Sequence, residues 1–114
     1  MFFPHGIGHL LGLQVHDVGG FMASPAGGTI DKPDGHPYLR LTRVLEQDHV
    51  LTIEPGLYFV PMLLHGLRSG PQAGSIDWAK VDHLSLFGGV RIEDNVRVAA
   101  SPENLTRTAF AEAE

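Results

Sequence analysis

The chain has 114 residues, enough for one domain at most, and its 43% hydrophobic content is ordinary for a globular protein. The formal net charge of −5 argues against a nucleic-acid partner or an anionic-membrane partner. The sequence contains no cysteine, which excludes a disulfide framework, a thiolate metal site and a cysteine nucleophile.

The start of the chain has no basic region followed by an apolar one, so we expect no signal peptide. No apolar run approaches the roughly 18 residues that a membrane helix needs. We therefore expect a cytoplasmic protein that does not interact with a membrane. The first motif with functional character begins at Pro4, close to an end that would fray. We therefore expect the sequence to be the C-terminal fragment of a longer protein.

The first half of the chain predicts strands and a long loop. Apolar residues alternate with small or polar ones over residues 11–16, which predicts a strand that ends at Asp17. Residues 23–37 are rich in glycine and proline in a polar setting, which predicts a long loop. Residues 50–60 predict a second strand, and Pro55 should bend it because proline cannot donate to a central ladder.

The second half adds a loop, a helix and a third strand. We expect a loop over residues 65–75 and a helix over residues 76–84, with Asp77 near the helix start. Residues 88–98 alternate with a period of two, which predicts a strand with an apolar face and a polar face. The predicted fold class is α+β, with mainly antiparallel strands and one or two short helices.

Three metal-competent residues stand in apolar or glycine-rich stretches: His9, Glu54 and Glu93. A buried carboxylate is costly unless a cation or hydrogen-bond donors compensate it. Two carboxylates and an imidazole suit a divalent ion such as Mn²⁺, Zn²⁺, Co²⁺ or Fe²⁺. If the strands that carry them are neighbours, the polar face of the sheet would hold Glu54 and Glu93 together with His16 and Arg91.

Each candidate also has a structural interpretation. The glycines between His5 and His9 disfavour a helix, so these histidines could lie in a turn beside a ligand or simply be satisfied in a glycine loop. His16 could shuttle protons or bind an oxyanion, or it could belong to a turn at the end of a strand. Glutamate is disfavoured inside strands, but Glu54 could be solvated on an edge strand. Arg91 could form an ordinary ion pair with a neighbouring acid on an exposed face.

Four segments in register, residues 5–9, 13–17, 52–56 and 89–94, resemble the prolidase and aminopeptidase P branch of the pita-bread metallopeptidases. The chain is most similar to bacterial Xaa-Pro dipeptidases, including the subgroup that also hydrolyses organophosphorus compounds. The resemblance implies that residues 1–107 are the C-terminal part of a pita-bread catalytic domain and that residues 108–114 are a tail.

The resemblance implies a role for each candidate residue. His9 and Glu54 match metal ligands, and Glu93 matches the glutamate that bridges two ions. His5 and His16 match histidines that contact substrate and stabilise the tetrahedral intermediate. Arg91 matches an active-site arginine. Arg40 matches an arginine that binds the carboxylate of the dipeptide.

The implied function is metal-dependent hydrolysis of Xaa-Pro dipeptides. Two divalent ions, Mn²⁺ foremost and Zn²⁺, Co²⁺ or Fe²⁺ as alternatives, would activate a water for attack on the Xaa-Pro carbonyl. The complete enzyme is expected to be a homodimer. Other readings are an aminopeptidase P, an organophosphate-hydrolysing prolidase, a non-enzymatic pita-bread binding module and a non-functional remnant. Because the family's two aspartate ligands precede this sequence, we expect the 114-residue chain alone to be inactive and to bind one ion at most, weakly.

Overall fold

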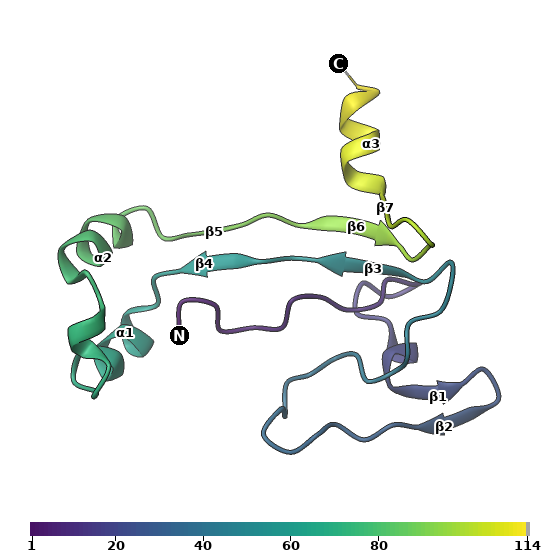
Figure 1. Cartoon of the computed structure of the whole chain (residues 1–114), viewed down its shortest axis with the longest axis horizontal. Coiled ribbons are helices and arrows are strands. Elements are labelled where there is room, and N and C mark those ends of the chain that lie inside the picture. Colours follow the sequence, from purple (N-terminus) through teal and green to yellow (C-terminus); the bar gives the residue numbers. More distant parts are fainter. Residues whose placement is uncertain (114) are drawn as a thin grey trace. The chain divides into compact units, whose positions relative to one another are not determined.

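The computed structural model describes residues 1–113 (Figure 1), which form two compact units. Unit 1 comprises Met1–Pro4 and Pro55–Ile92, and unit 2 comprises His5–Glu54 together with the residues from Glu93 onward. Both units combine helices with antiparallel strand pairs, so the predicted α+β class is confirmed. Among the described residues, no helix has the length and apolar character needed to cross a membrane.

The main sheet of unit 2 has three antiparallel strands in the order β3 (Val50–Ile53), β6 (Asp94–Arg97) and β7 (Glu103–Asn104). β3 and β6 lie side by side over their whole length (Figure 1), and their register places Ile53 opposite Asp94. The two central residues of β3, Leu51 and Thr52, are buried.

The free edge of β3 is occupied by residues 7–11, which run along it as an irregular extra strand. Alternate backbone amides of β3 and this segment form hydrogen bonds: Glu54 N to Ile7 O at 2.7 Å, Thr52 N to His9 O at 2.9 Å and Leu11 N to Val50 O at 2.9 Å. Gly8 makes this approach possible, because a Cβ at this position would lie 1.9 Å from the Thr52 carbonyl oxygen. β3 therefore lies between this segment and β6.

Residues 12–49 form an excursion that leaves and returns at the Leu11–Val50 hydrogen bond. It contains a 3₁₀-helix, η1 (Val18–Phe21), whose N-cap is Asp17; this carboxylate accepts a hydrogen bond from Gly19 N at 2.7 Å. The hairpin β1 (Met22–Ser24) and β2 (Gly27–Thr29) follows (Figure 1). Later residues fold back onto η1, since the amides of Thr42 and Arg43 both donate to Gly20 O, at 2.9 and 3.0 Å.

A helix cap and a pair of ion pairs stabilise the C-terminal part of unit 2. Helix α3 (Leu105–Ala111) begins at Asn104, whose side chain accepts from Arg107 N at 2.9 Å. Arg97 on β6 forms ion pairs with Glu103 at 2.7 Å and Asp48 at 2.6 Å. Hydrogen bonds to Glu103 first and to Asp48 second raise the pKa of the Arg97 guanidinium above its ordinary value.

Unit 1 pairs β4 (Gly56–Tyr58) with β5 (Gly89–Arg91) and contains helices α1 (Pro61–Arg68) and α2 (Trp78–Ser85), with the 3₁₀-helix η2 (Ala73–Ser75) between them. Pro61 suits the first turn of α1, where an amide would have no partner. Asp77 caps α2 by accepting from Lys80 N at 3.0 Å.

The core of unit 1 is entirely apolar. Leu64, Leu67 and Val81 are buried between the two helices, and four partly buried residues pack against them: Phe2, Phe59, Ile76 and Trp78. At the edge of this core, the Arg68 guanidinium lies 4.2 Å from the centre of the Trp78 ring and forms an ion pair with Asp82.

Two strand and helix predictions are confirmed and four are wrong in part or in whole. The bend at Pro55 and the helix near residues 76–84 are present as β3, β4 and α2. The predicted strand over 11–16 is absent, because Asp17 N turns back to Leu10 O at 3.1 Å and leaves Leu13 fully exposed. The predicted loop over 65–75 begins within α1, the loop over 23–37 contains most of the β1–β2 hairpin, and the third strand is divided into β5 and β6.

Helix α3 was also not expected, so the described residues contain three α-helices rather than one or two. Residues 108–111, part of the segment expected to be a tail, form the second half of α3. The helix is supported by its cap at Asn104 and by the Thr108 hydroxyl, which donates to Asn104 O at 3.0 Å.

Candidate metal centre

The structure brings His9, Glu54 and Glu93 together. Each offers one ligand atom, and these three atoms lie within 4.8 Å of one another. His9 and Glu54 are only 5% and 8% exposed, whereas Glu93 is exposed. Among residues 1–113, these three form the cluster of histidine and acidic side chains that could hold a metal ion. All three residues belong to unit 2.

Strand pairing explains why the three residues meet. Ile53 and Asp94 are the last paired residues of β3 and β6, so the next residue on each strand, Glu54 and Glu93, continues the antiparallel register beyond the pair. On the other edge of β3, Glu54 N is bound to Ile7 O and Thr52 N to His9 O. The three candidate ligands therefore come from three segments that are distant in sequence, and they lie at the same end of β3.

The imidazole of His9 has a defined tautomer. Its Nδ1 lies 3.0 Å from the Leu10 carbonyl oxygen, which can only accept, so Nδ1 carries the proton. In the neutral ring, Nε2 then presents a lone pair, and it faces Glu54 Oε1 at 3.2 Å. Two acceptors at this distance require either a proton between them, carried by one of the two groups, or a metal ion.

The donor set fits a divalent ion. Two ligand atoms that each lie about 2.1 Å from one ion, at a right angle, are about 3 Å apart. The separation of 3.2 Å between His9 Nε2 and Glu54 Oε1 agrees with this value. The structural alternative is an ion pair between a protonated imidazole and the carboxylate, which would satisfy the two groups without Glu93.

Thr52 is a site residue that sequence reasoning missed. It is 1% exposed, and its hydroxyl lies 3.1 Å from His9 N and 3.0 Å from Glu54 Oε1. The available signal was its position two residues before Glu54, which puts both side chains on the same face of a strand.

The two other candidate histidines lie close to the ligands along the chain or in space. The rings of His16 and His9 pack edge to face, with centres 4.4 Å apart, and His16 remains exposed. His5 is half-buried, with Nδ1 2.7 Å from Gly6 O. Of the two, His16 is therefore the one whose ring contacts a candidate ligand in this way.

The candidate arginines have different positions. Arg40 is exposed and lies in the excursion of unit 2, where its carbonyl closely approaches Gly20. Arg91 is exposed on β5 of unit 1, opposite Gly56. The pairing that joins the three metal-competent residues thus includes neither arginine.

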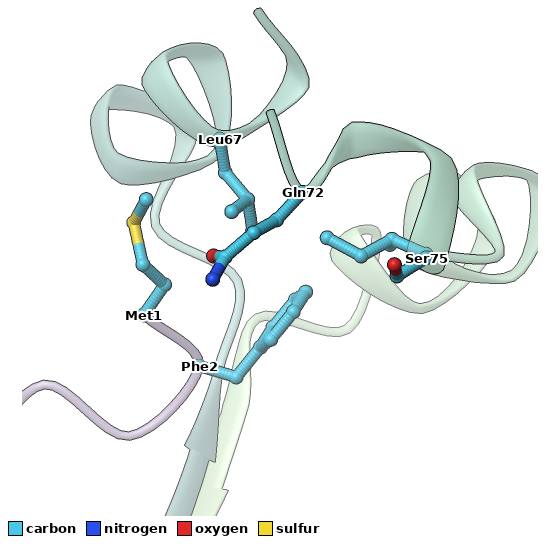
Figure 2. Close-up of a pocket in the computed structure, with 6 residues that line it drawn as sticks. Met1, Phe2, Leu67, Gln72 and Ser75 are labelled. Carbon is cyan, nitrogen blue, oxygen red and sulfur yellow. The ribbon is translucent and has the colours of Figure 1, made fainter. Parts of the chain in front are cut away.

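Unit 1 contains a hollow. Figure 2 shows that it is lined by Met1, Phe2 and Leu67 together with side chains near η2; the remaining lining residues are Gln72, Ser75 and Ile76. None of the candidate site residues lines it. Its wall is largely the edge of the apolar core, whereas the three metal-competent residues belong to unit 2.

Comparison with known proteins gives a family match over most of the chain. The model of metallopeptidase family M24 matches residues 1–100. The chain is 60% identical to a Xaa-Pro dipeptidase from Xanthomonas campestris pv. campestris (strain 8004) over 111 residues, which are 96% of this chain and 25% of the relative. It is 59% identical to the Xaa-Pro dipeptidases of Xanthomonas axonopodis pv. citri (strain 306) and Stenotrophomonas maltophilia (strain K279a), over 98% of this chain and 26% of each relative. The chain thus spans about a quarter of the length of the curated relatives it matches.

Proposed function

Because the chain belongs to metallopeptidase family M24, we propose that it supplies part of the metal centre of a peptidase that hydrolyses Xaa-Pro dipeptides. One observation carries the proposal. His9 Nε2, on a buried side chain, faces Glu54 Oε1 at 3.2 Å, and a ligand atom of Glu93 belongs to the same group. The proposed substrate class is that of the relatives, which are Xaa-Pro dipeptidases.

In this proposal His9 and Glu54 would hold the first divalent ion, and Glu93 would be a ligand shared by both ions. When bound, the ions supply Lewis-acid activation of the water that attacks the peptide carbonyl. Mn²⁺ is the proposed metal, with Zn²⁺, Co²⁺ and Fe²⁺ as the alternatives, because the set is rich in carboxylates and has one imidazole and no thiolate. The Leu10 carbonyl fixes the His9 ring, as outer partners of metal-binding histidines do.

The neighbouring histidines act on substrate. The His16 ring lies against the His9 ring and is exposed, so an N–H of His16 is available to stabilise the oxyanion that develops on the attacked carbonyl. His5 and Arg91 contact the substrate in this proposal.

Arg40 binds the free carboxylate of the dipeptide by a bidentate contact, which favours dipeptides over longer peptides. Its exposure in the excursion leaves it accessible. Arg43 is the matched comparison, because it is half-buried, lies 3.4 Å from Glu46 and has an Nε without an acceptor among the described residues. The effects of the two arginines on substrate preference can therefore be measured side by side.

A chimera tests the activity. This chain replaces the matching quarter of the Xanthomonas campestris Xaa-Pro dipeptidase, to which it is 60% identical. We expect Mn²⁺-dependent cleavage of Ala-Pro, and loss of that cleavage in the same chimera with Glu54→Gln. A folded chimera that binds Mn²⁺ without cleaving Ala-Pro would contradict the proposed activity. A folded chimera that binds no metal would instead support a non-enzymatic binding module.

The same chimera tests the role of Arg40. Arg40→Ala should lower kcat/KM for Ala-Pro by about tenfold or more, since a hydrogen bond to a charged group contributes about 1.5–3 kcal/mol. Cleavage of amidated Ala-Pro and of an organophosphate should change little, because neither has the free carboxylate. Equal losses on all three substrates would show that Arg40 does not select for the carboxylate. Arg43→Ala, measured in parallel, shows whether the effect is specific to Arg40.

The 114-residue chain by itself should bind at most one Mn²⁺, weakly, and should not cleave Ala-Pro. The reason is that residues 1–113 offer one group of three ligands, while the proposed reaction uses two ions. Binding should weaken as pH falls, since protons compete with the metal for the ligands. Calorimetric titration with Mn²⁺ at several pH values measures both. Two tight sites, or cleavage by this chain alone, would refute the prediction.

A cytoplasmic location and a homodimeric complete enzyme are further parts of the proposal.

A further inference from the structure

Thr52 has the most deeply buried side chain among the described residues of unit 2, the unit that contains the candidate metal centre. It lies in the middle of β3, between His9 on one edge and Asn95 of β6 on the other. At 1% exposed, it is the largest fully buried side chain among the described residues. A hydroxyl at such a place must be fully hydrogen-bonded, because an unsatisfied buried polar group is costly.

The hydroxyl of Thr52 connects two of the three candidate ligands. The backbone amide of His9 can only donate, so Thr52 Oγ1 accepts from it, at 3.1 Å. The hydroxyl proton is then left for Glu54, whose Oε1 lies 3.0 Å from Oγ1. The same carboxylate oxygen is the one that faces His9 Nε2 at 3.2 Å. One hydroxyl therefore holds the backbone that carries the imidazole and also the carboxylate oxygen that the imidazole faces.

The residue type is suited to this task. Threonine is branched at Cβ, so its side chain has few rotamers, and the hydroxyl is held in a fixed direction. Its position two residues before Glu54 puts the two side chains on the same face of β3. Valine would fill the same space without a hydroxyl. It would leave the His9 amide and Glu54 Oε1 each short of one partner.

We propose that Thr52 is a positioning residue of the metal centre, which sets the orientation of Glu54 and the placement of His9 through its hydroxyl. This inference rests on the proposed metal site and adds a residue that does not itself contact the ion. Its role is distinct from packing, because packing depends on the size of the side chain and positioning depends on the hydroxyl.

Two pairs of side chains separate the hydroxyl from the size. Thr52 and Thr52→Val have the same shape and differ in the hydroxyl; Thr52→Ser and Thr52→Ala both lack the methyl group and also differ in the hydroxyl. Mn²⁺ affinity is measured by calorimetry on the 114-residue chain, and metal-free stability by thermal unfolding in a chelator. We expect Thr52→Val to bind Mn²⁺ about 10- to 100-fold more weakly, the usual cost of losing an outer partner of a ligand. Thr52→Ser should bind within about twofold of the wild type although it is less stable.

The outcomes distinguish this inference from the function on which it rests. A wild-type chain that binds no Mn²⁺ would overturn the metal site and this inference with it. A wild-type chain that binds Mn²⁺, together with Thr52→Val that binds equally well, would overturn the positioning role alone. Affinities that fall with metal-free stability across all variants, serine included, would also overturn it. If Thr52→Val does not fold, the serine and alanine variants make the same comparison, with about tenfold weaker binding expected for alanine.

Discussion

The two units differ in the polarity of their buried side chains. In unit 1 the buried side chains are Leu64, Leu67 and Val81, and aromatic and aliphatic neighbours surround them. In the described part of unit 2, two of the five buried side chains are leucines and three are polar or charged: His9, Thr52 and Glu54. The first interior is stabilised by removing apolar surface from water. The second depends on hydrogen bonds and on a cation for its imidazole and carboxylate.

Because of this difference, we expect substitutions in unit 1 to change stability and substitutions in the polar interior of unit 2 to change metal binding. A substitution in the apolar interior changes how much apolar surface is buried and leaves no polar group without a partner. A substitution in the polar interior leaves a donor or an acceptor unsatisfied and disturbs the atoms that would hold the ion. The chain offers a separate reporter for each. Trp78, the only tryptophan, packs against the apolar core, and Mn²⁺ affinity reports on the ligands.

The largest expected effect is on the apolar side. Leu67→Ala should lower the free energy of unfolding of unit 1 by about 2–5 kcal/mol, because it removes buried methyl groups and leaves a cavity. Urea denaturation followed by Trp78 fluorescence measures the loss. Mn²⁺ affinity should stay within about twofold of the wild type. A parallel loss of affinity would show that the two interiors are not independent.

Removing an imidazole should have the next largest effect, on binding rather than on the fluorescence of Trp78. His9→Ala should weaken Mn²⁺ binding by about 100-fold or more, since losing a ligand should cost at least as much as losing its outer partner. Calorimetry provides the measurement. His65→Ala is the control, because His65 is exposed on α1 and should bind as the wild type does. Unchanged binding by His9→Ala would identify the His9–Glu54 contact as an ion pair only.

A pair of glycines tests how closely residues 7–11 must approach β3. A Cβ on Gly8 would lie 1.9 Å from the Thr52 carbonyl oxygen, whereas a Cβ on Gly6 would meet nothing within 4 Å. Gly8→Ala should therefore destabilise unit 2 by about 1–3 kcal/mol, as overpacking does, and should weaken Mn²⁺ binding because His9 must move. Gly6→Ala should do neither. Thermal unfolding by circular dichroism, with calorimetry, decides, and equal behaviour of the two variants would contradict the expectation.

The smallest effect concerns a charged pair outside both interiors. Arg68 and Asp82 form an ion pair on unit 1 that is largely solvent-exposed. Asp82→Asn should change the free energy of unfolding by about 0.5 kcal/mol or less, since exposed ion pairs contribute little. Added salt should reduce even this difference. A loss above about 1.5 kcal/mol in urea denaturation would mean that surface charge, and not burial, also stabilises unit 1.

The sequence predicted the features that depend on strong local signals. Pro55 bends the strand after Glu54, and Asp77 begins the helix α2. The α+β class and the family are confirmed, and the three metal-competent residues do converge. Their convergence was predicted only on the condition that the strands are neighbours. The register of β3 and β6 meets that condition.

Other features depend on contacts that local pattern does not encode. Apolar alternation over 11–16 suggested a strand, but no other segment of residues 1–113 forms a strand pair with it, and Leu13 is fully exposed. The loop predicted over residues 65–75 begins within α1, although Pro61 was an available signal for the start of that helix. The contact between Thr52 and His9 could not be predicted, because the two residues are 43 positions apart in the sequence.

The excursion over residues 12–49 has a consequence for how such a protein can change. Both ends of the excursion are held at one hydrogen bond, Leu11 N to Val50 O at 2.9 Å. The ligands lie outside it, since His9 precedes it and Glu54 follows it. Closing a longer loop is thermodynamically cheap, about 0.6 kcal/mol for each doubling of its length. Insertions, deletions and exchanges in this segment can therefore accumulate over evolution, and can reshape what surrounds the ligands, while the ligands themselves keep their places.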